Sequence, residues 1–507
     1  SPNLVRLEGG SFDTYRGQVA LAWQVGQWDF YGSLSAAKSD GYRVNSGLEQ
    51  YRGTLNIGYS FGNDSEVRLI AYAADINQDV PGTLSLANAL TTGRTVGAGV
   101  VANKWARNQD IQRVTLQTRL HLTDSLLFEG GVYTTWTDLH HPIPIVIDQK
   151  IDTQGAFGRF SWDGELAGHK ADMFFGAYYR QGGNKQGLFV NMGSVNGFQF
   201  GKASLDASGL DVFAEGRFWA TDSFALVAGG SYGHASRDYR DLLSSANDRS
   251  KSFNWFSPRL GLLWQNSEGL QVYANVTRSV EPPHYGALVQ GGVPGFVPVS
   301  AQKAWTAELG TRGKAGAVTW DFTFYRSWLK GELLSFNGTT GFPAFFFNAG
   351  KTVHQGIEAS LDWRIIDDPN AGLLRLRQTY AWSDFTFDND PVYGNGRLPV
   401  APEHQYRASL RYDHPSGAYI EPALDWRMKS VWVDYANTLK APAYALLNLE
   451  LGWKLSNGLT LFADLRNLTD KRYAAEFAAL TDARIDATDV FYPGEGRSAF
   501  VGATFRF

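Results

Sequence analysis

The reactive side chains of this chain offer few arrangements that could support catalysis or hold a metal. There is no cysteine, which excludes disulfides, thiolate metal sites and cysteine nucleophiles. Nine histidines are scattered along the sequence, and only His140 and His141 are adjacent. Neighbouring residues of a strand point to opposite faces, so these two histidines could not share one metal ion. We therefore predict no metal site.

Recognisable catalytic motifs are also missing. The sequence has no Gly-rich phosphate loop followed by lysine, no zinc-binding helix motif and no nucleophile elbow. Asp238, Asp241 and Asp248 lie near Arg237 and Arg240 and are best explained as a solvated segment of alternating charge. We predict no catalytic residues, no cofactor and no enzymatic activity.

Aromatic and basic residues in irregular segments favour binding instead. Arginine pairs with carboxylates through two hydrogen bonds, and aromatic rings stack on planar groups, so such segments suit an anionic, ring-bearing ligand. The alternative for each aromatic residue is an interfacial belt or packing within the loops. The predicted ligand contacts are Trp105, Arg107, Arg240, His284, Tyr285, Phe346, Trp432 and Tyr435.

The segments that must position these residues show the two-residue period of β-strands. At the end of the chain, Ala499, Val501, Ala503, Phe505 and Phe507 share one face. The other face is polar apart from Phe500. A final strand of this kind is expected to pair with the first strand and close a barrel in a lipid bilayer, which leaves no open edge.

Short polar turns alternate with long irregular segments along the whole chain. Roughly ten residues of alternation flank each turn, which gives about 22 strands in an antiparallel transmembrane barrel. The turns are 26–27, 62–65, 123–125, 221–223, 266–269, 367–370, 416–417 and 456–458. The long outward loops are 77–109, 140–154, 182–205, 236–251, 280–300, 337–351, 387–403, 432–442 and 474–495.

Composition agrees with a barrel and excludes other classes. Basic and acidic residues are nearly balanced, at 46 and 50, so nothing indicates a nucleic-acid partner. No run of 18 apolar residues is present that could form a spanning helix. The residues expected to face the lumen include the charged Glu66, Arg68 and Arg113. Each of these charges must contact water, an opposite charge on the wall or another domain.

Several motifs resemble the TonB-dependent outer-membrane receptors. Asn467–Tyr473 (NLTDKRY) is similar to a segment found near the end of that family, and it is followed by Tyr492–Arg497 and a last strand ending in Phe507. Arg278–Pro283, Asn348–Glu358 and Gly10–Gly17 also look like segments of the receptor barrel. The resemblance covers the chain from its first to its last strand.

The resemblance implies a monomeric receptor in the outer membrane of a Gram-negative bacterium, surrounded by outer-membrane lipid. It implies a scarce ligand, most often a ferric siderophore, and import powered by the TonB complex. It also implies an N-terminal plug domain that fills the lumen, whereas residues 1–507 correspond to the barrel alone. We therefore expect a longer receptor with the plug and the TonB-contact segment upstream. The alternatives are a plugless open porin and uptake of a small cofactor or saccharide.

Overall fold

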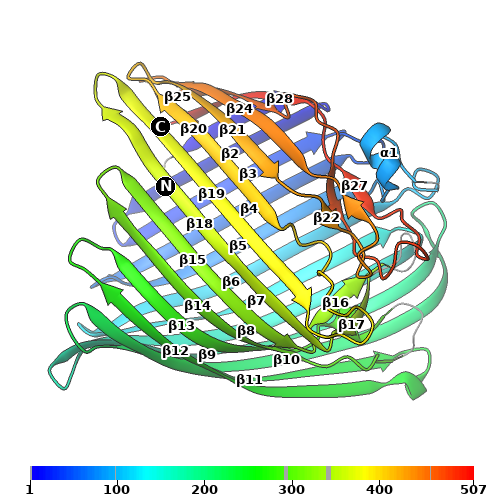
Figure 1. Cartoon of the computed structure of the whole chain (residues 1–507), viewed down its shortest axis with the longest axis horizontal. Helices are drawn as coiled ribbons and strands as arrows, with labels where there is room; N and C mark the ends of the chain where they lie inside the picture. The colour runs from blue at the N-terminus through cyan, green and yellow to red at the C-terminus, as the bar shows by residue number, and fades with distance from the viewer. Residues whose placement is uncertain (1–2, 98, 291–294, 338–343, 457) are drawn as a thin grey trace.

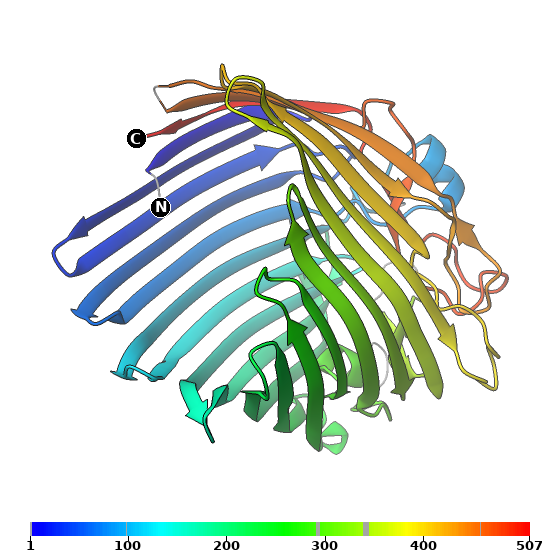
Figure 2. The same cartoon turned by 60° about the vertical axis from the view of Figure 1, so that its left-hand side comes forward.

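A computed structural model describes residues 3–97, 99–290, 295–337, 344–456 and 458–507. These residues form a wide antiparallel barrel, whose tilted strands run around the whole molecule in Figures 1 and 2. One sheet of 22 strands makes the wall. The first strand, β1, pairs with β2 on one side and with the last strand, β28, on the other, where Leu4 faces Arg506 and Gly10 faces Phe500. The prediction of a closed 22-stranded barrel is confirmed.

The wall strands differ greatly in length. They are β1 (Leu4–Gly10), β2 (Thr14–Val25), β3 (Trp28–Ser39), β4 (Leu48–Gly62), β5 (Ser65–Asp79), β6 (Ala106–Thr123), β7 (Leu126–Pro142), β8 (Ile145–Leu166), β9 (His169–Asn191), β10 (Asn196–Trp219), β11 (Phe224–Asp241), β12 (Arg249–Gln265), β13 (Gln271–Glu281), β14 (Gln302–Ala315), β15 (Val318–Lys330), β18 (Lys351–Asp368), β19 (Gly372–Phe387), β20 (His404–Asp413), β21 (Ala418–Arg427), β24 (Tyr444–Lys454), β25 (Leu459–Arg466) and β28 (Ser498–Arg506).

Smaller elements decorate the loops at one end of the barrel. They are α1 (Leu86–Thr91), η1 (Ser245–Asn247), α2 (Tyr285–Leu288) and three hairpins, β16 (Leu333–Phe336) with β17 (Phe345–Asn348), β22 (Val431–Trp432) with β23 (Lys440–Ala441), and β26 (Ala474–Phe477) with β27 (Phe491–Pro493). Among the described residues, no helix has the length and apolar character needed to span a membrane.

Side-chain alternation separates an apolar outer face from a polar inner face. Along β15, Phe322, Phe324 and Trp328 are exposed on the outside. Thr323 and Ser327 on the other face form hydrogen bonds with Tyr273 of β13 and Thr306 of β14. The outer residues contact lipid, and the inner residues line the lumen. Phe500, the apolar exception on the polar face of β28, lies under the guanidinium groups of Arg16 and Arg466, 5.4 and 4.7 Å from its ring centre.

Every turn predicted from the sequence joins two consecutive wall strands. Asn457, in the middle of the 456–458 turn, lies outside the described residues. The structure adds two turns that the sequence analysis did not name, at 167–168 between β8 and β9 and at 316–317 between β14 and β15. Asn63 and Asp64 both adopt left-handed backbone angles (φ 49° and 52°), which a two-residue hairpin between right-twisted strands requires.

Three of the predicted loops are wrong in extent, because most of their residues continue the wall. Residues 140–154 belong largely to β7 and β8, residues 182–205 to β9 and β10, and residues 236–251 to β11 and β12. These strands rise beyond the apolar band, where water wets both faces, so both faces are polar and the apolar alternation disappears. The loops 280–300 and 337–351 match the prediction except at 291–294 and 338–343, which lie outside the described residues.

Candidate binding site at the mouth of the barrel

The inner wall carries a belt of arginine–carboxylate pairs, most of them in the half nearest the short turns. Arg68 bonds both Asp29 (2.7 Å) and Glu66 (2.8 Å), and Arg411 bonds both Asp413 (2.8 Å) and Glu421 (3.0 Å). The pairs join residues of one strand, of adjacent strands or of strands separated by one other, so the wall neutralises much of its own charge. The other pairs of the belt are Arg6 and Arg16 with Glu8, Arg159 with Glu129, Arg217 with Asp172, Arg259 with Glu215, Arg375 with Asp362, Arg377 with Glu421, and Arg466 with Asp464.

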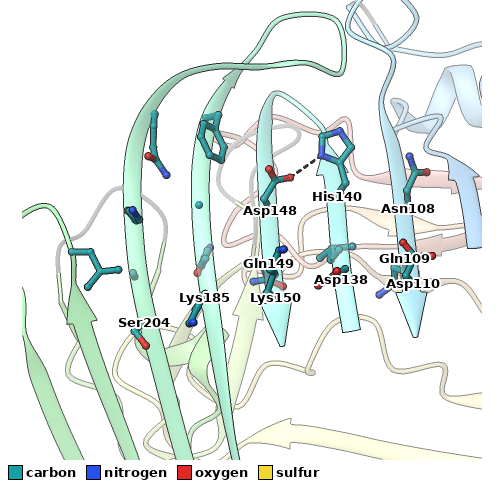
Figure 3. Close-up of a pocket in the computed structure, with 18 of the residues that line it drawn as sticks. Asn108, Gln109, Asp110, Asp138, His140, Asp148, Gln149, Lys150, Lys185 and Ser204 are labelled. Atoms are coloured by element: carbon teal, nitrogen blue, oxygen red, sulfur yellow. Dashed lines mark hydrogen bonds and ion pairs between the residues drawn. The ribbon is translucent and has the colours of Figure 1, made fainter. Parts of the chain in front are cut away.

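A hollow of about 670 Å³ lies over β5 to β11 toward their loop ends (Figure 3). Seven of its polar lining residues form one cross-strand row: Asp75, Asp110, Asp138, Lys150, Lys185, Ser204 and Arg240. By strand alternation this row shares its face with Val114 and Val132, which are exposed on the lipid side. The hollow therefore opens on the outer wall and not into the lumen.

Arg240, a predicted ligand contact, lies in this outer-face row. Its side chain leaves the outer face of β11 and forms an ion pair of 2.8 Å with Asp206 on β10. His140 lies on the same face, where Asp148 and the carbonyl oxygen of Ser194 occupy its two ring nitrogens at 2.7 and 3.0 Å (Figure 3). His141 follows on the inner face and contacts the carbonyl oxygen of Ala106 at 2.7 Å. The two adjacent histidines thus point to opposite sides of the wall.

The loop that carries α2 folds inward over the lumen. Tyr285, Val289 and Phe296 pack on Leu205 and Tyr239, which are inner-face residues of β10 and β11. The hydroxyl of Tyr285 accepts a hydrogen bond from the backbone N–H of Asp238 (2.9 Å) and contacts the carbonyl oxygens of Asp206 and Asp238. Burial raises the pKa of Tyr285 to about 12. Tyr285, a predicted ligand contact, therefore serves as an anchor for this loop.

Two other predicted contacts are buried inside the loops. The ring of Trp105 is 8% exposed and lies against Gly82 and Val100. Tyr435 is 4% exposed, donates to the carbonyl oxygen of Ser335 (2.9 Å), and burial raises its pKa above the usual range. Both rings contribute to the loop core, which is the alternative interpretation that the sequence analysis gives for aromatic residues in loops.

The remaining predicted residues keep accessible surface. His284 meets the ring of Phe346 edge to face, with 4.9 Å between ring centres, and both sit on the inward-folded loop and its neighbour β17. The ammonium of Lys440 lies over Trp432, 3.9 Å from the ring centre. Arg107 is exposed beside His141 at the inner, loop end of β6. The structure brings His284 and Phe346 together, whereas Trp432 and Arg107 lie on other segments.

An ionisable cluster that the sequence analysis missed lines the inner wall at the loop end of β18. His354 stacks on Phe385 with 4.1 Å between ring centres and contacts Glu332 at 3.2 Å. Thr352 donates its hydroxyl hydrogen to the same carboxylate. The sequence could have indicated this cluster, because Thr352 and His354 occupy alternate positions within the Asn348–Glu358 motif and so share one face of a strand. Among the described residues, no group of three or more metal-ligating side chains converges.

The Asn467–Tyr473 motif has a structural role. The Asn467 amide donates to the carbonyl oxygens of Lys471 (3.0 Å) and Glu495 (2.9 Å) and accepts from the N–H of Lys471 (2.8 Å). Asp470 accepts from the N–H of Arg497 (2.9 Å). The motif thus fastens the segment before β28 to the end of β25, beside the seam where the barrel closes.

A closed wall with an apolar outside, short turns at one end and inward-folded loops at the other defines a large outer-membrane transport barrel. The family model "TonB dependent receptor-like, beta-barrel" matches residues 7–468, and the chain belongs to this family. It is accordingly a protein of the Gram-negative outer membrane.

Similar proteins include named receptors. The chain is 25% identical over 315 residues to the pesticin receptor of Yersinia enterocolitica, a match that covers 60% of this chain and 45% of that protein. It is 26% identical over 269 residues to the ferrioxamine B receptor of Salmonella typhimurium, covering 51% and 36%. The fold is shared with the ferric yersiniabactin uptake receptor FyuA of Yersinia pestis (TM-score 0.83, 19% identity, 100% of this chain and 80% of that chain). The matches therefore cover less than half of the curated relatives, and all three proteins are named as receptors.

Proposed function

We propose that this chain is the barrel of a receptor that binds a ferric siderophore at its mouth and imports it with energy from the TonB complex. The observation that carries the proposal is the group of rings and ionisable side chains on the inner, loop end of a family barrel: His284 with Phe346, and His354 with Phe385. The names of the ferrioxamine B and ferric yersiniabactin receptors support an iron chelate as the ligand class.

The chemistry of the mouth favours an anionic ligand with planar rings. Exposed Arg107 offers charge, and the stacked and edge-on aromatic rings offer flat apolar surfaces. A catecholate or carboxylate iron chelate meets both demands. Haem fits less well, because the only adjacent histidines, His140 and His141, point to opposite sides of the wall.

We further propose that a plug domain fills the lumen in the complete, monomeric receptor, and that its TonB-contact segment transmits the energy for transport. The competing function is an open porin. It is favoured by the belt of ion pairs, because inner charges that neutralise one another need no partner domain. A saccharide or small cofactor is the alternative ligand if transport is energy-dependent but does not involve iron.

The decisive experiment measures uptake of radioactive iron by a deletion strain carrying the complete gene. Hydroxamate, catecholate and carboxylate chelates are offered separately, with and without a protonophore. We expect saturable uptake of one chelate class that the protonophore abolishes. Uptake that continues without the proton-motive force would favour the porin, and energised uptake of none of the chelates would favour another ligand.

A matched pair of variants tests the mouth itself. His354→Ala removes an inner-face ring, and we expect the apparent affinity for the chelate to fall on the order of tenfold, about 1.4 kcal/mol. His234→Ala is the control, because His234 lies on the outer face and bonds Asn254. Equal affinities of the two variants would contradict the proposed site.

A further inference from the structure

Three lysines form a single row on the outer wall at the loop ends of β14, β15 and β18. Lys303 is the ladder partner of Lys330, and Lys330 is the partner of Lys351. All three side chains are exposed. Directly opposed residues of adjacent strands have β-carbons about 5 Å apart, and like charges at that spacing repel. Such a row is unfavourable unless something anionic covers it.

The described part of the protein does not supply enough negative charge. Among the described residues, none of the three lysines forms an ion pair. Asp388 lies beside Lys351 and donates its backbone N–H to the carbonyl oxygen of Lys351 (3.0 Å), but its carboxylate accepts from Asn389 at 2.9 Å. Two more cations lie on the same outer face. Arg278 is one cross-strand row nearer the short turns than the lysines, and Arg326 is two rows nearer. Arg326 reaches Gln355 (3.2 Å) and lies 5.5 Å from the ring centre of Trp328.

The position of the lysine row along the barrel axis indicates which layer of the membrane contacts it. Trp305 and Trp328 are ladder partners in the next outer row toward the short turns, and each is nearly half exposed (46% and 47%). Below the row that contains Arg326, the outer face is apolar, with Leu309, Phe322 and Phe324 exposed. Tryptophan pairs of this kind mark the boundary between hydrocarbon and headgroups. The lysines therefore lie at the level of the headgroups of the outer leaflet.

We propose that this lysine row docks the phosphate groups of an anionic membrane glycolipid, whose acyl chains run down the apolar face below Trp305 and Trp328. Lysine ammonium groups attract phosphate as point charges, and a phosphorylated headgroup spanning three strands would relieve their mutual repulsion. The site is separate from the mouth, because its residues alternate with inner-face Thr306 and Ser327, which bond each other across the ladder at 2.8 Å.

The outer hollow provides a matched control. Lys150, Lys185 and Lys202 also lie on the outer wall above the apolar band, exposed and without an ion pair among the described residues. Asp138 is the direct ladder partner of Lys150, however, and Asp148 lies in the row of Lys202. This wall therefore mixes both signs of charge, and we expect it to bind the same lipid more weakly.

The test titrates purified protein with a bis-phosphorylated disaccharide glycolipid and counts bound lipid by native mass spectrometry. In the K303Q/K330Q/K351Q variant we expect the affinity to fall by about tenfold or more. In K150Q/K185Q/K202Q, which removes the same charge, the change should stay within about twofold. K303R/K330R/K351R should retain binding, and rising salt should weaken it. Migration of unheated samples on gels verifies folding, and K330Q alone replaces the triple variant if the latter does not fold.

Several results would overturn the proposal. They are equal losses in the two triple-glutamine variants, unchanged affinity in K303Q/K330Q/K351Q, equally tight binding of the dephosphorylated glycolipid, and displacement of the lipid by an equal concentration of inorganic phosphate. The last result would identify a site for free anions, and the first would identify a general charge effect.

Discussion

At the scale of single residues, two side chains that the sequence analysis singled out, those of Tyr285 and Asn467, hold loops in place. Tyr285 was expected to contact a ligand from its aromatic character, yet its hydroxyl is bound to the backbone of β10 and β11. Asn467, within a motif recognised by resemblance, joins two segments that are 28 residues apart. An aromatic or amide side chain in a loop is ambiguous in sequence, because its partners are backbone groups that only the fold brings near.

Asn467→Ala should destabilise the segment that precedes the last strand. The substitution leaves the N–H and C=O groups of Lys471 and the C=O of Glu495 without their side-chain partner, and it places alanine at a left-handed backbone angle (φ 47°). We expect a cost of about 2–4 kcal/mol, seen as faster hydrogen exchange at 467–473 and 494–497. Asn370→Ala, in an exposed short turn, is the control, and equal exchange in both variants would argue against the clamp.

Alkaline pH should release the loop that carries α2. A free tyrosine ionises near pH 10, whereas the docked Tyr285 has a pKa of about 12. Since the undocked hydroxyl loses its proton first, the docking free energy is intact below pH 10 and declines as the pH rises from about 10 to 12. Cleavage within 282–290 by an alkali-stable protease should accelerate in that range. Tyr285→Phe should already be cleaved faster at pH 8, because the N–H of Asp238 loses its acceptor at a cost of about 1–3 kcal/mol.

At the scale of strands and turns, alternation predicted most of the wall. In the last strand, Val501 and Phe505 face outward as predicted from alternation. Phe500, the apolar residue on the polar face, is explained by its contacts with two arginines. The prediction failed where strands leave the bilayer. Residues such as Asp148 and Lys150 are polar on a face that would be apolar lower down, so the sequence resembles a loop. The parity of β11 could have placed Arg240 on the outer face, because it lies eight residues from exposed Tyr232.

Gly10→Ala should weaken the seam that closes the barrel. A β-carbon at Gly10 would lie 2.3 Å from the carbonyl oxygen of Ala499, whereas one at Gly17 would meet only the Leu7 side chain at 3.6 Å. The close contact is with backbone and can be relieved only by separating β1 from β28. We expect Gly10→Ala to cost about 1–3 kcal/mol and to lower the urea concentration at which unheated protein loses its folded gel mobility, with Gly17→Ala close to wild type. If Gly17→Ala were instead the more destabilised variant, the prediction that close packing at the β1–β28 seam limits stability would be wrong.

At the scale of the whole molecule, a wall of 22 strands encloses more space than its own inner side chains fill. The chain by itself, inserted in a planar bilayer, should therefore give a large and steady conductance. The complete receptor should be closed if a plug occupies the lumen. A silent barrel with verified insertion would indicate that the inward-folded loops seal the mouth, and a conducting complete protein would favour the porin.

The unequal strand lengths have a consequence outside the cell. β9 and β10 have 23 and 24 residues, whereas β20 and β21 have 10 each. At about 3.3 Å per residue and a tilt near 45°, the longer strands rise on the order of 30 Å above a 25 Å apolar band. One side of the rim is thus a tall, hydrogen-bonded wall of strands, whereas the opposite side is low and carries loops. A large particle from the medium, such as an antibody, would contact the tall side formed by β9 and β10 first. A small solute could reach the lumen from the low side, over β20 and β21.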